Sequence, residues 1–183
     1  LIYFVLFRFK MIKSRFVMIK IREAQIKDCP IILQFIKELA QYEKEPDAVE
    51  ATVEILEESI FDKKQAKVVL LEENGESVGF ALYFFNFSTW RGKAGLYLED
   101  LFVRPQHRGK GYGKMLLSYL ANQAVEQGCP RFEWIVLDWN QPSIDFYKAM
   151  GAKPLDEWTV FRLENEKLQG LAKTYRISSG LEG

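Results

Sequence analysis

Hydrophobic and polar positions along the chain predict a mixture of helices and strands. From Ile31 to Leu39 apolar residues recur at the spacing of one helix face. Apolar residues run together over residues 67–72 and 77–87, and the pair Asn74-Gly75 between them is typical of a tight β-hairpin. We expect strands over residues 18–22, 67–72, 77–87, 96–103, 131–138 and 159–163, and helices over residues 28–42, 52–60, 111–127 and 140–151. A polar, helical tail is expected to follow.

This order of elements predicts the fold class. Hairpins followed by strand–helix–strand indicate α/β (α+β) architecture, with a single mixed, mostly antiparallel sheet and helices on both faces. A length of 183 residues favours one domain, placed at residues 18–175, with a flexible tail over residues 176–183. Residues 1–17 are apolar and basic, but their apolar run precedes the charges, unlike a secretory signal, and is too short for a membrane span. We therefore expect a non-native or disordered extension there.

Charge and cysteine content narrow the class of function. The 25 Lys and Arg residues balance the 25 Asp and Glu residues, so the chain lacks the basic character of a dedicated nucleic-acid binder. Cys29 and Cys129 form no CxxC pair and no secreted disulfide framework. These features predict a cytoplasmic protein that has neither nucleic acid nor membrane as a partner.

A glycine-rich loop is the strongest chemical signal. It joins the predicted strand that ends at Val103 to a helix, and its glycines let backbone N–H groups converge next to the helix N-terminus, which suits a pyrophosphate. The loop fits neither the Walker A pattern nor a dinucleotide fingerprint. A turn that only connects the two elements is the structural alternative. The residues singled out here are Arg108, Gly109, Lys110, Gly111, Tyr112 and Gly113.

Two adjacent acids on a predicted strand are the second signal. Alternation places Glu99 on one face with Tyr97 and Asp100 on the other with Leu98. Carboxylates in so apolar a strand are costly unless they line a wet cleft, and such a cleft would attract a cationic amine. The structural alternative for Asp100 is that it accepts backbone hydrogen bonds at an irregularity of the sheet.

A third motif follows the strand predicted over residues 131–138. Asn140 is a predicted helix cap, Pro142 suits the first turn, and Tyr147 lies about two turns further along. By spacing alone Tyr147 is an aromatic core residue whose hydroxyl finds a partner.

Together with residues 35–43 and 90–93, these motifs carry a family resemblance. Over residues 19–168 the chain resembles the GCN5-related N-acetyltransferase (GNAT) superfamily, in the subgroup of spermidine/spermine (diamine) and thialysine acetyltransferases. The matching segments are FIKELAQYE (35–43), WRGK (90–93), YLEDLFV (97–103), RGKGYG (108–113) and WNQPSIDFY (139–147). The resemblance implies a sheet that splays beside residues 96–103, a homodimer, and acetyl-CoA as co-substrate with no metal.

The resemblance also implies roles for particular residues. Tyr147 matches the family's general acid and Glu99 the acid beside the substrate amine. The acyl-donor site would comprise Leu101, Phe102, Val103, the loop residues Arg108 to Gly113, Asn140, Ser143 and Tyr147. The substrate site would comprise Tyr42, Glu43, Trp90, Glu99 and Asp100.

These roles predict an N-acetyltransferase that acts by direct attack. An alkylamine with a pKa of about 10 is protonated at neutral pH, so Glu99 would take its proton and Tyr147 would protonate the departing thiolate. No acid precedes Trp90 in the sequence Phe87-Ser88-Thr89, which favours a short diamine or a lysine-like amine over a long polyamine. A protein or peptide lysine acetyltransferase and a non-catalytic acetyl-CoA-binding protein are the alternatives.

Overall fold

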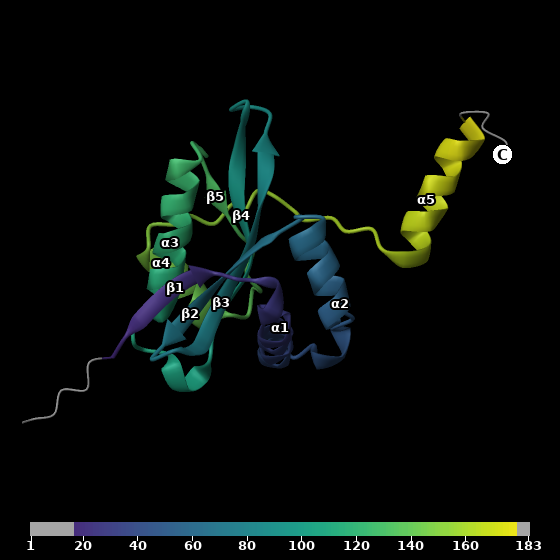
Figure 1. Cartoon of the computed structure of the whole chain (residues 1–183). Helices are drawn as coiled ribbons and strands as arrows, with labels where there is room; N and C mark the ends of the chain where they lie inside the picture. The colour runs from purple at the N-terminus through teal and green to yellow at the C-terminus, as the bar shows by residue number, and fades with distance from the viewer. Residues whose placement is uncertain (1–16, 179–183) are drawn as a thin grey trace, which may run out of the picture. The chain divides into compact units, whose positions relative to one another are not determined.

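The computed structural model describes residues 17–178 (Figure 1). The chain divides into two compact units, one up to Ile135 and one from Val136 onward, and each is described by itself. Residues 1–16 of the expected extension and residues 179–183 of the expected tail lie outside the described part.

The first unit is built on an open sheet of five strands in the order β1-β2-β3-β4-β5, which are labelled in Figure 1. Strands β1 to β4 pair antiparallel with their neighbours, and β5 pairs parallel with β4. The predicted mixed, mostly antiparallel sheet is thereby confirmed. The strands are β1 Ile19–Glu23, β2 Lys67–Glu73, β3 Glu76–Ser88, β4 Lys93–Val103 and β5 Phe132–Glu133.

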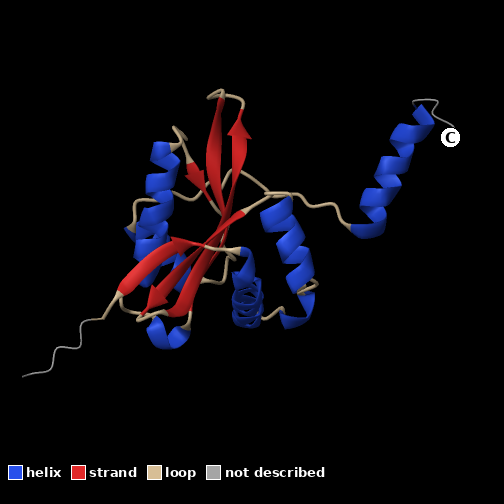
Figure 2. Ribbon diagram, viewed as in Figure 1, coloured by secondary structure: helices blue, strands red, loops and turns tan. Residues whose placement is uncertain are grey.

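Helices cover both faces of the sheet (Figure 2). On one face lie α1 Cys29–Glu43 and α2 Val53–Leu56, which continues as a π-helical turn over Glu57–Asp62. The ring of Phe35 on α1 stacks on Phe80 of β3 at 5.4 Å between centroids, and Phe102 of β4 packs against the same ring at 6.3 Å. On the other face lies α3 Tyr112–Glu126. The contact between Phe35 and Phe102 joins the end of β4 to α1.

The second unit contains α4 Gln141–Ala149 and α5 Asn165–Ser178. Asn140 caps α4, since its side chain accepts a hydrogen bond from the Ser143 N–H at 3.4 Å. Gly151 follows the helix with a φ of 89°, a conformation common after a helix C-terminus. The predicted capped helix and helical tail are both confirmed.

Two strand predictions were wrong in extent or existence. The strand predicted over residues 131–138 is reduced to Phe132–Glu133, because its pairing with β4 ends at Tyr97, two residues before β4 becomes irregular. The segment 159–163 is not a strand. A strand needs a neighbour to hydrogen-bond, and no described residue pairs with this segment, where Val160 is 70% and Phe161 91% exposed.

Candidate active site

Strand β4 carries a bulge at the two acids. Leu82 of β3 pairs with Asp100, but the next residue, Tyr83, pairs with Leu98, so Glu99 is an extra residue in the ladder. A bulge bends the strand and redirects the side chains around it. Glu99 is exposed and Asp100 is half-buried.

The bulge corrects the predicted arrangement of the faces. Directly opposed residues in an antiparallel pair point to the same side of a sheet, and the consecutive residues Leu82 and Tyr83 point to opposite sides. Leu98 and Asp100, which oppose Tyr83 and Leu82, therefore lie on opposite faces. The prediction that they share a face was wrong, because strict alternation does not survive an inserted residue.

Three carboxyl groups interact around this bulge. Burial, together with the negative charges of Glu99 and Glu43, raises the pKa of Asp100 to about 7. Burial also raises the pKa of Glu43, the last residue of α1. The raised pKa of Asp100 shows that negative charge is concentrated around this bulge. Such a site favours a cation.

The glycine-rich loop begins directly after β4. Gly109 and Gly111 adopt φ values of +75° and +83°, which favour glycine, and a Cβ at either position would meet no atom within 4 Å. Gly111 is the N-cap of α3, and Gly113 lies in the first turn. The backbone here is open and leads to a helix N-terminus, where unpaired N–H groups and the helix dipole favour an anion.

Arg108 connects this loop to α1. Its Nε donates to the Val103 carbonyl oxygen at 2.9 Å, and its guanidinium lies 4.8 Å from the Tyr42 ring centroid and 5.6 Å from that of Phe102. The cation therefore stays at the junction of strand and loop, and Tyr42 lies one residue before the acid Glu43.

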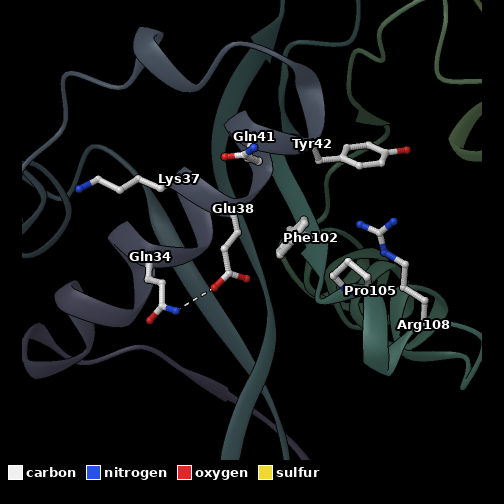
Figure 3. Close-up of a pocket in the computed structure, with 8 residues that line it drawn as sticks. All are labelled: Gln34, Lys37, Glu38, Gln41, Tyr42, Phe102, Pro105 and Arg108. Carbon is white, nitrogen blue, oxygen red and sulfur yellow. Dashed lines mark hydrogen bonds between the residues drawn. The ribbon is translucent and has the colours of Figure 1, made fainter.

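A pocket of about 480 Å³ opens beside Arg108, between α1 and the end of β4 (Figure 3). Sequence analysis identified Tyr42, Phe102 and Arg108 but missed the other residues of its lining. Four of those lie on α1 at positions that repeat every three or four residues, so a polar helical stripe was the available signal. The missed residues are Gln34, Lys37, Glu38, Gln41 and Pro105.

The last residue of β2, Glu73, was also missed. Its carboxylate accepts hydrogen bonds from Lys110 Nζ at 2.8 and 3.0 Å and from the Tyr112 hydroxyl at 2.8 Å. The Nδ1 atom of His107 contacts the same carboxylate. These donors lower the pKa of Glu73 to about 2, with Lys110 as the largest cause. The side chain of Lys110, which we expected to face a phosphate, is thus paired with an acid of the protein.

The predicted splay of the sheet is seen at β5. Parallel pairing joins Leu96 to Phe132 and Tyr97 to Glu133 and goes no further. Beyond it, the edge of β4 that includes Leu101 to Val103 has no described strand beside it. A free strand edge presents backbone donors and acceptors to an extended ligand.

Trp90 is not brought to the acids. It lies in the turn between β3 and β4 with 89% of its surface exposed. From Lys93, where β4 begins, to Glu99 a strand spans roughly 20 Å. Within one chain the predicted substrate group therefore reduces to Tyr42, Glu43, Glu99 and Asp100.

Three of the predicted site residues belong to the second unit. Asn140 is buried, and Ser143 and Tyr147 are half-buried on α4. The Tyr147 ring packs against Phe146 with 5.3 Å between centroids. Their grouping with Glu99 and the loop stays a prediction from the sequence.

Two further features bear on the class of protein. Among residues 17–178 no helix has the length and apolar character needed to cross a bilayer. The same residues contain no group of three or more His, Cys, Asp or Glu side chains suited to hold a metal ion.

The chain is similar to known acetyltransferases. Residues 32–152 match the Acetyltransferase (GNAT) family. A thialysine N-epsilon-acetyltransferase from Bos taurus is 41% identical over 166 residues, which cover 84% of this chain and 97% of that protein. An L-ornithine N5-acetyltransferase from Arabidopsis thaliana is 47% identical over 95 residues, covering 52% of this chain and 42% of that one.

A solved structure is similar to the fold. An integron cassette protein from the mobile metagenome of V. cholerae superposes with a TM-score of 0.73 and 29% identity, covering 85% of this chain and 98% of its own.

Proposed function

This chain belongs to the acetyltransferase (GNAT) family and is an N-acetyltransferase that resembles the thialysine enzymes, and from that premise we propose its substrates and the roles of its residues. It transfers the acetyl group of acetyl-CoA to a primary amine of a small cationic substrate. That substrate is a diamine or polyamine, or a lysine-like amine such as thialysine.

The observation that carries this proposal is that a cluster of acids and an anion-binding loop lie close together along the chain. The acids surround the bulge of β4, and the loop follows the end of the same strand. Asp100, with its neighbours Glu99 and Glu43, provides the surplus of negative charge that a cationic amine would neutralise. Four residues after Asp100 the strand gives way to the loop that contains Arg108, Gly109 and Gly111. The acids could therefore bind a cationic amine, and the loop could bind an anionic donor a few residues further along the chain.

The loop suits the phosphates of acetyl-CoA. The two glycines leave the backbone uncovered, and α3 begins at the following residue, so N–H groups are available for a pyrophosphate. The Arg108 side chain and the backbone N–H groups of residues 109–113, that of Lys110 included, would hold it. The free edge of β4 at Leu101, Phe102 and Val103 would bind the pantetheine arm. Acetyl-CoA supplies an acetyl group activated as a thioester. Asn140, Ser143 and Tyr147 are proposed to lie along the same donor.

Glu99 is proposed to accept the ammonium proton of the substrate. Because that ammonium has a pKa of about 10, the nucleophilic amine is scarce at neutral pH unless a carboxylate takes the proton. Asp100 and Glu43 keep the remaining charges of the substrate near the bulge. Tyr147 donates its phenolic proton to the thiolate that leaves, and no covalent enzyme intermediate is needed.

Substrate length follows from the missing acid near Trp90. The hairpin tip carries Ser88 and Thr89 before the tryptophan, so a long polycation lacks an anchor there, and we prefer a short diamine or a lysine-like amine. Assembly as a homodimer is a further proposal that rests on the family resemblance. A cytoplasmic location is another, and it rests on the cysteine pattern.

The test is release of free thiol from acetyl-CoA with a panel of amines. The panel holds spermidine, spermine, putrescine, lysine, thialysine, ornithine and a lysine-containing peptide. We expect turnover with one or more of the small amines. Turnover with the peptide alone would support a protein acetyltransferase instead, and CoA binding without any turnover would support a regulatory binder.

A further inference from the structure

The side chain of Glu73, at the end of β2, connects the β2–β3 hairpin to the glycine-rich loop. The carboxylate of Glu73 contacts His107, which precedes the glycines, and Lys110 and Tyr112, which flank Gly111. One acidic group therefore holds three residues distributed along the whole loop. Sequence motifs gave no reason to expect it, because Glu73 is 34 residues from the nearest of them.

The backbone of the hairpin fixes the direction of Glu73. A register shift between Leu71 and Glu72 marks a bulge in the pairing of β2 with β3. The turn that follows contacts the residue before β1, since the Asn74 N–H donates to the Met18 carbonyl oxygen at 2.7 Å. Glu72 has a different partner, Arg22, at 2.6 Å. Adjacent glutamates thus serve different contacts, and only Glu73 contacts the loop.

The loop has a physical need for such a support. Glycine at Gly109 and Gly111 permits the left-handed backbone that the loop adopts, but glycine also loses the most conformational freedom when it becomes ordered. A ligand that must order the loop binds more weakly than one that meets it already in place. Charge-assisted hydrogen bonds on both sides of the glycines pre-organise it.

We propose that Glu73 is a positioning residue for acyl-donor binding, one that holds the 107–112 loop in its binding conformation although its own charge repels phosphate. This inference rests on the proposed use of acetyl-CoA. It predicts a change in CoA affinity opposite to the one that simple electrostatics predicts. Removing a negative charge beside an anion site should tighten CoA binding, because it removes Coulomb repulsion. Removing a residue that holds the loop in place should weaken CoA binding instead.

The experiment compares Glu73→Gln with Glu76→Gln by calorimetric titration with CoA. Glu76 lies opposite Glu73 in the same hairpin, its side chain is 69% exposed, and its nearest cation, Arg104, is 3.6 Å away. Both variants lose one negative charge, but only Glu73→Gln releases the loop. We expect Glu73→Gln to raise the Kd for CoA about tenfold, as for one lost charge-assisted hydrogen bond, and Glu76→Gln to leave it unchanged or slightly lower.

A truncated donor separates positioning from general damage to the fold. S-Acetyl-pantetheine lacks the phosphates, so its kcat/KM should be equal in Glu73→Gln and in the unaltered protein, while kcat/KM with acetyl-CoA falls about tenfold. Equal or tighter CoA binding by Glu73→Gln would overturn the proposal, as would an equal loss with both donors. Failure of the unaltered protein to bind CoA would instead overturn the proposed function.

Discussion

The guanidinium of Arg108 lies over the ring of Tyr42, 4.8 Å from its centroid, while its Nε donates to the Val103 carbonyl. This contact joins the start of the glycine-rich loop to the last turn of α1, next to the acidic Glu43. An arginine is needed for both interactions, since a lysine ammonium has neither the planar face nor a second donor at the required position.

Arg108→Lys is therefore expected to weaken the donor site although the charge is kept. We predict a rise of about tenfold in KM for acetyl-CoA, with kcat changed less. Arg162→Lys, at a side chain that is 71% exposed in the second unit, is the matched control. Unchanged KM in Arg108→Lys would show that its positive charge alone is sufficient.

Glu99→Gln tests the proposed proton acceptor. Turnover near pH 7 should fall by roughly 10²–10⁴-fold and recover in part at higher pH, where unprotonated amine becomes available without a base. The pH dependence of kcat/KM is the measurement. Glu58→Gln, whose side chain is 57% exposed, serves as control, and a profile for Glu99→Gln that matches the unaltered protein would remove Glu99 from this role.

Tyr147→Phe tests the proposed proton donor. Loss of the phenolic proton should lower kcat by roughly 10²–10⁴-fold and leave CoA affinity nearly intact. Kinetics and calorimetry on the same preparation provide the comparison. Tyr175→Phe on α5, where the side chain is 72% exposed, should behave like the unaltered protein. Normal turnover in Tyr147→Phe would contradict the assignment.

Asp100 should make the folded protein less stable as the pH rises. Its pKa is raised from 3.8 to about 7 on folding, so between these values the native state binds more protons than the unfolded state, and stability falls with increasing pH. Asp100→Asn removes this penalty. Its stabilising effect should be larger at pH 8 than at pH 5, by on the order of 2 kcal/mol, in denaturant titrations at both pH values. The same effect at both would show that Asp100 ionises normally.

Gly95 of β4 leaves no space for a side chain. A Cβ there would meet Asn86 Oδ1 at 2.5 Å and Arg131 Nε at 2.8 Å, and the Arg131 guanidinium is held by Glu133 at 2.9 Å. We expect Gly95→Ala to lower the free energy of unfolding by about 1–3 kcal/mol, as overpacking does. Gly170→Ala on α5 meets no atom within 4 Å and should stabilise its helix. Equal stability of Gly95→Ala and the parent in urea would contradict this reading.

The sequence allowed prediction of most of the elements, but not of the details that arrange the site. Periodicity identified α1, and Asn74-Gly75 identified the hairpin, because these signals are local. The bulge at Glu99 was not predictable from alternation, since it appears only in the register between β3 and β4. The short β5 likewise depends on where its neighbour becomes irregular.

Contacts between segments far apart in the sequence could not be predicted from it either. Glu73 joins the loop only because β2 ends beside the start of α3, a matter of how the elements are placed. The segment 159–163 has the apolar character of a strand and yet is unpaired, because composition does not supply a neighbour. Among the site residues, sequence motifs indicated those on β4 and in the loop, whereas the polar stripe of α1 is a pattern shared by any solvent-exposed helix face and does not by itself distinguish a pocket.

The packing of Phe102 has a consequence for how this enzyme could diverge. Its ring lies in the buried cluster with Phe35, between the acidic bulge and the donor loop, and so anchors the segment that connects them. If Glu43 and Asp100 bind the amine as proposed, substitutions there would alter the choice of amine while the glycine-rich loop keeps its contacts with Glu73 and Arg108. The preference for the amine acceptor could therefore change by mutation, while the packing of Phe102 against Phe35 preserves the site for the acyl donor.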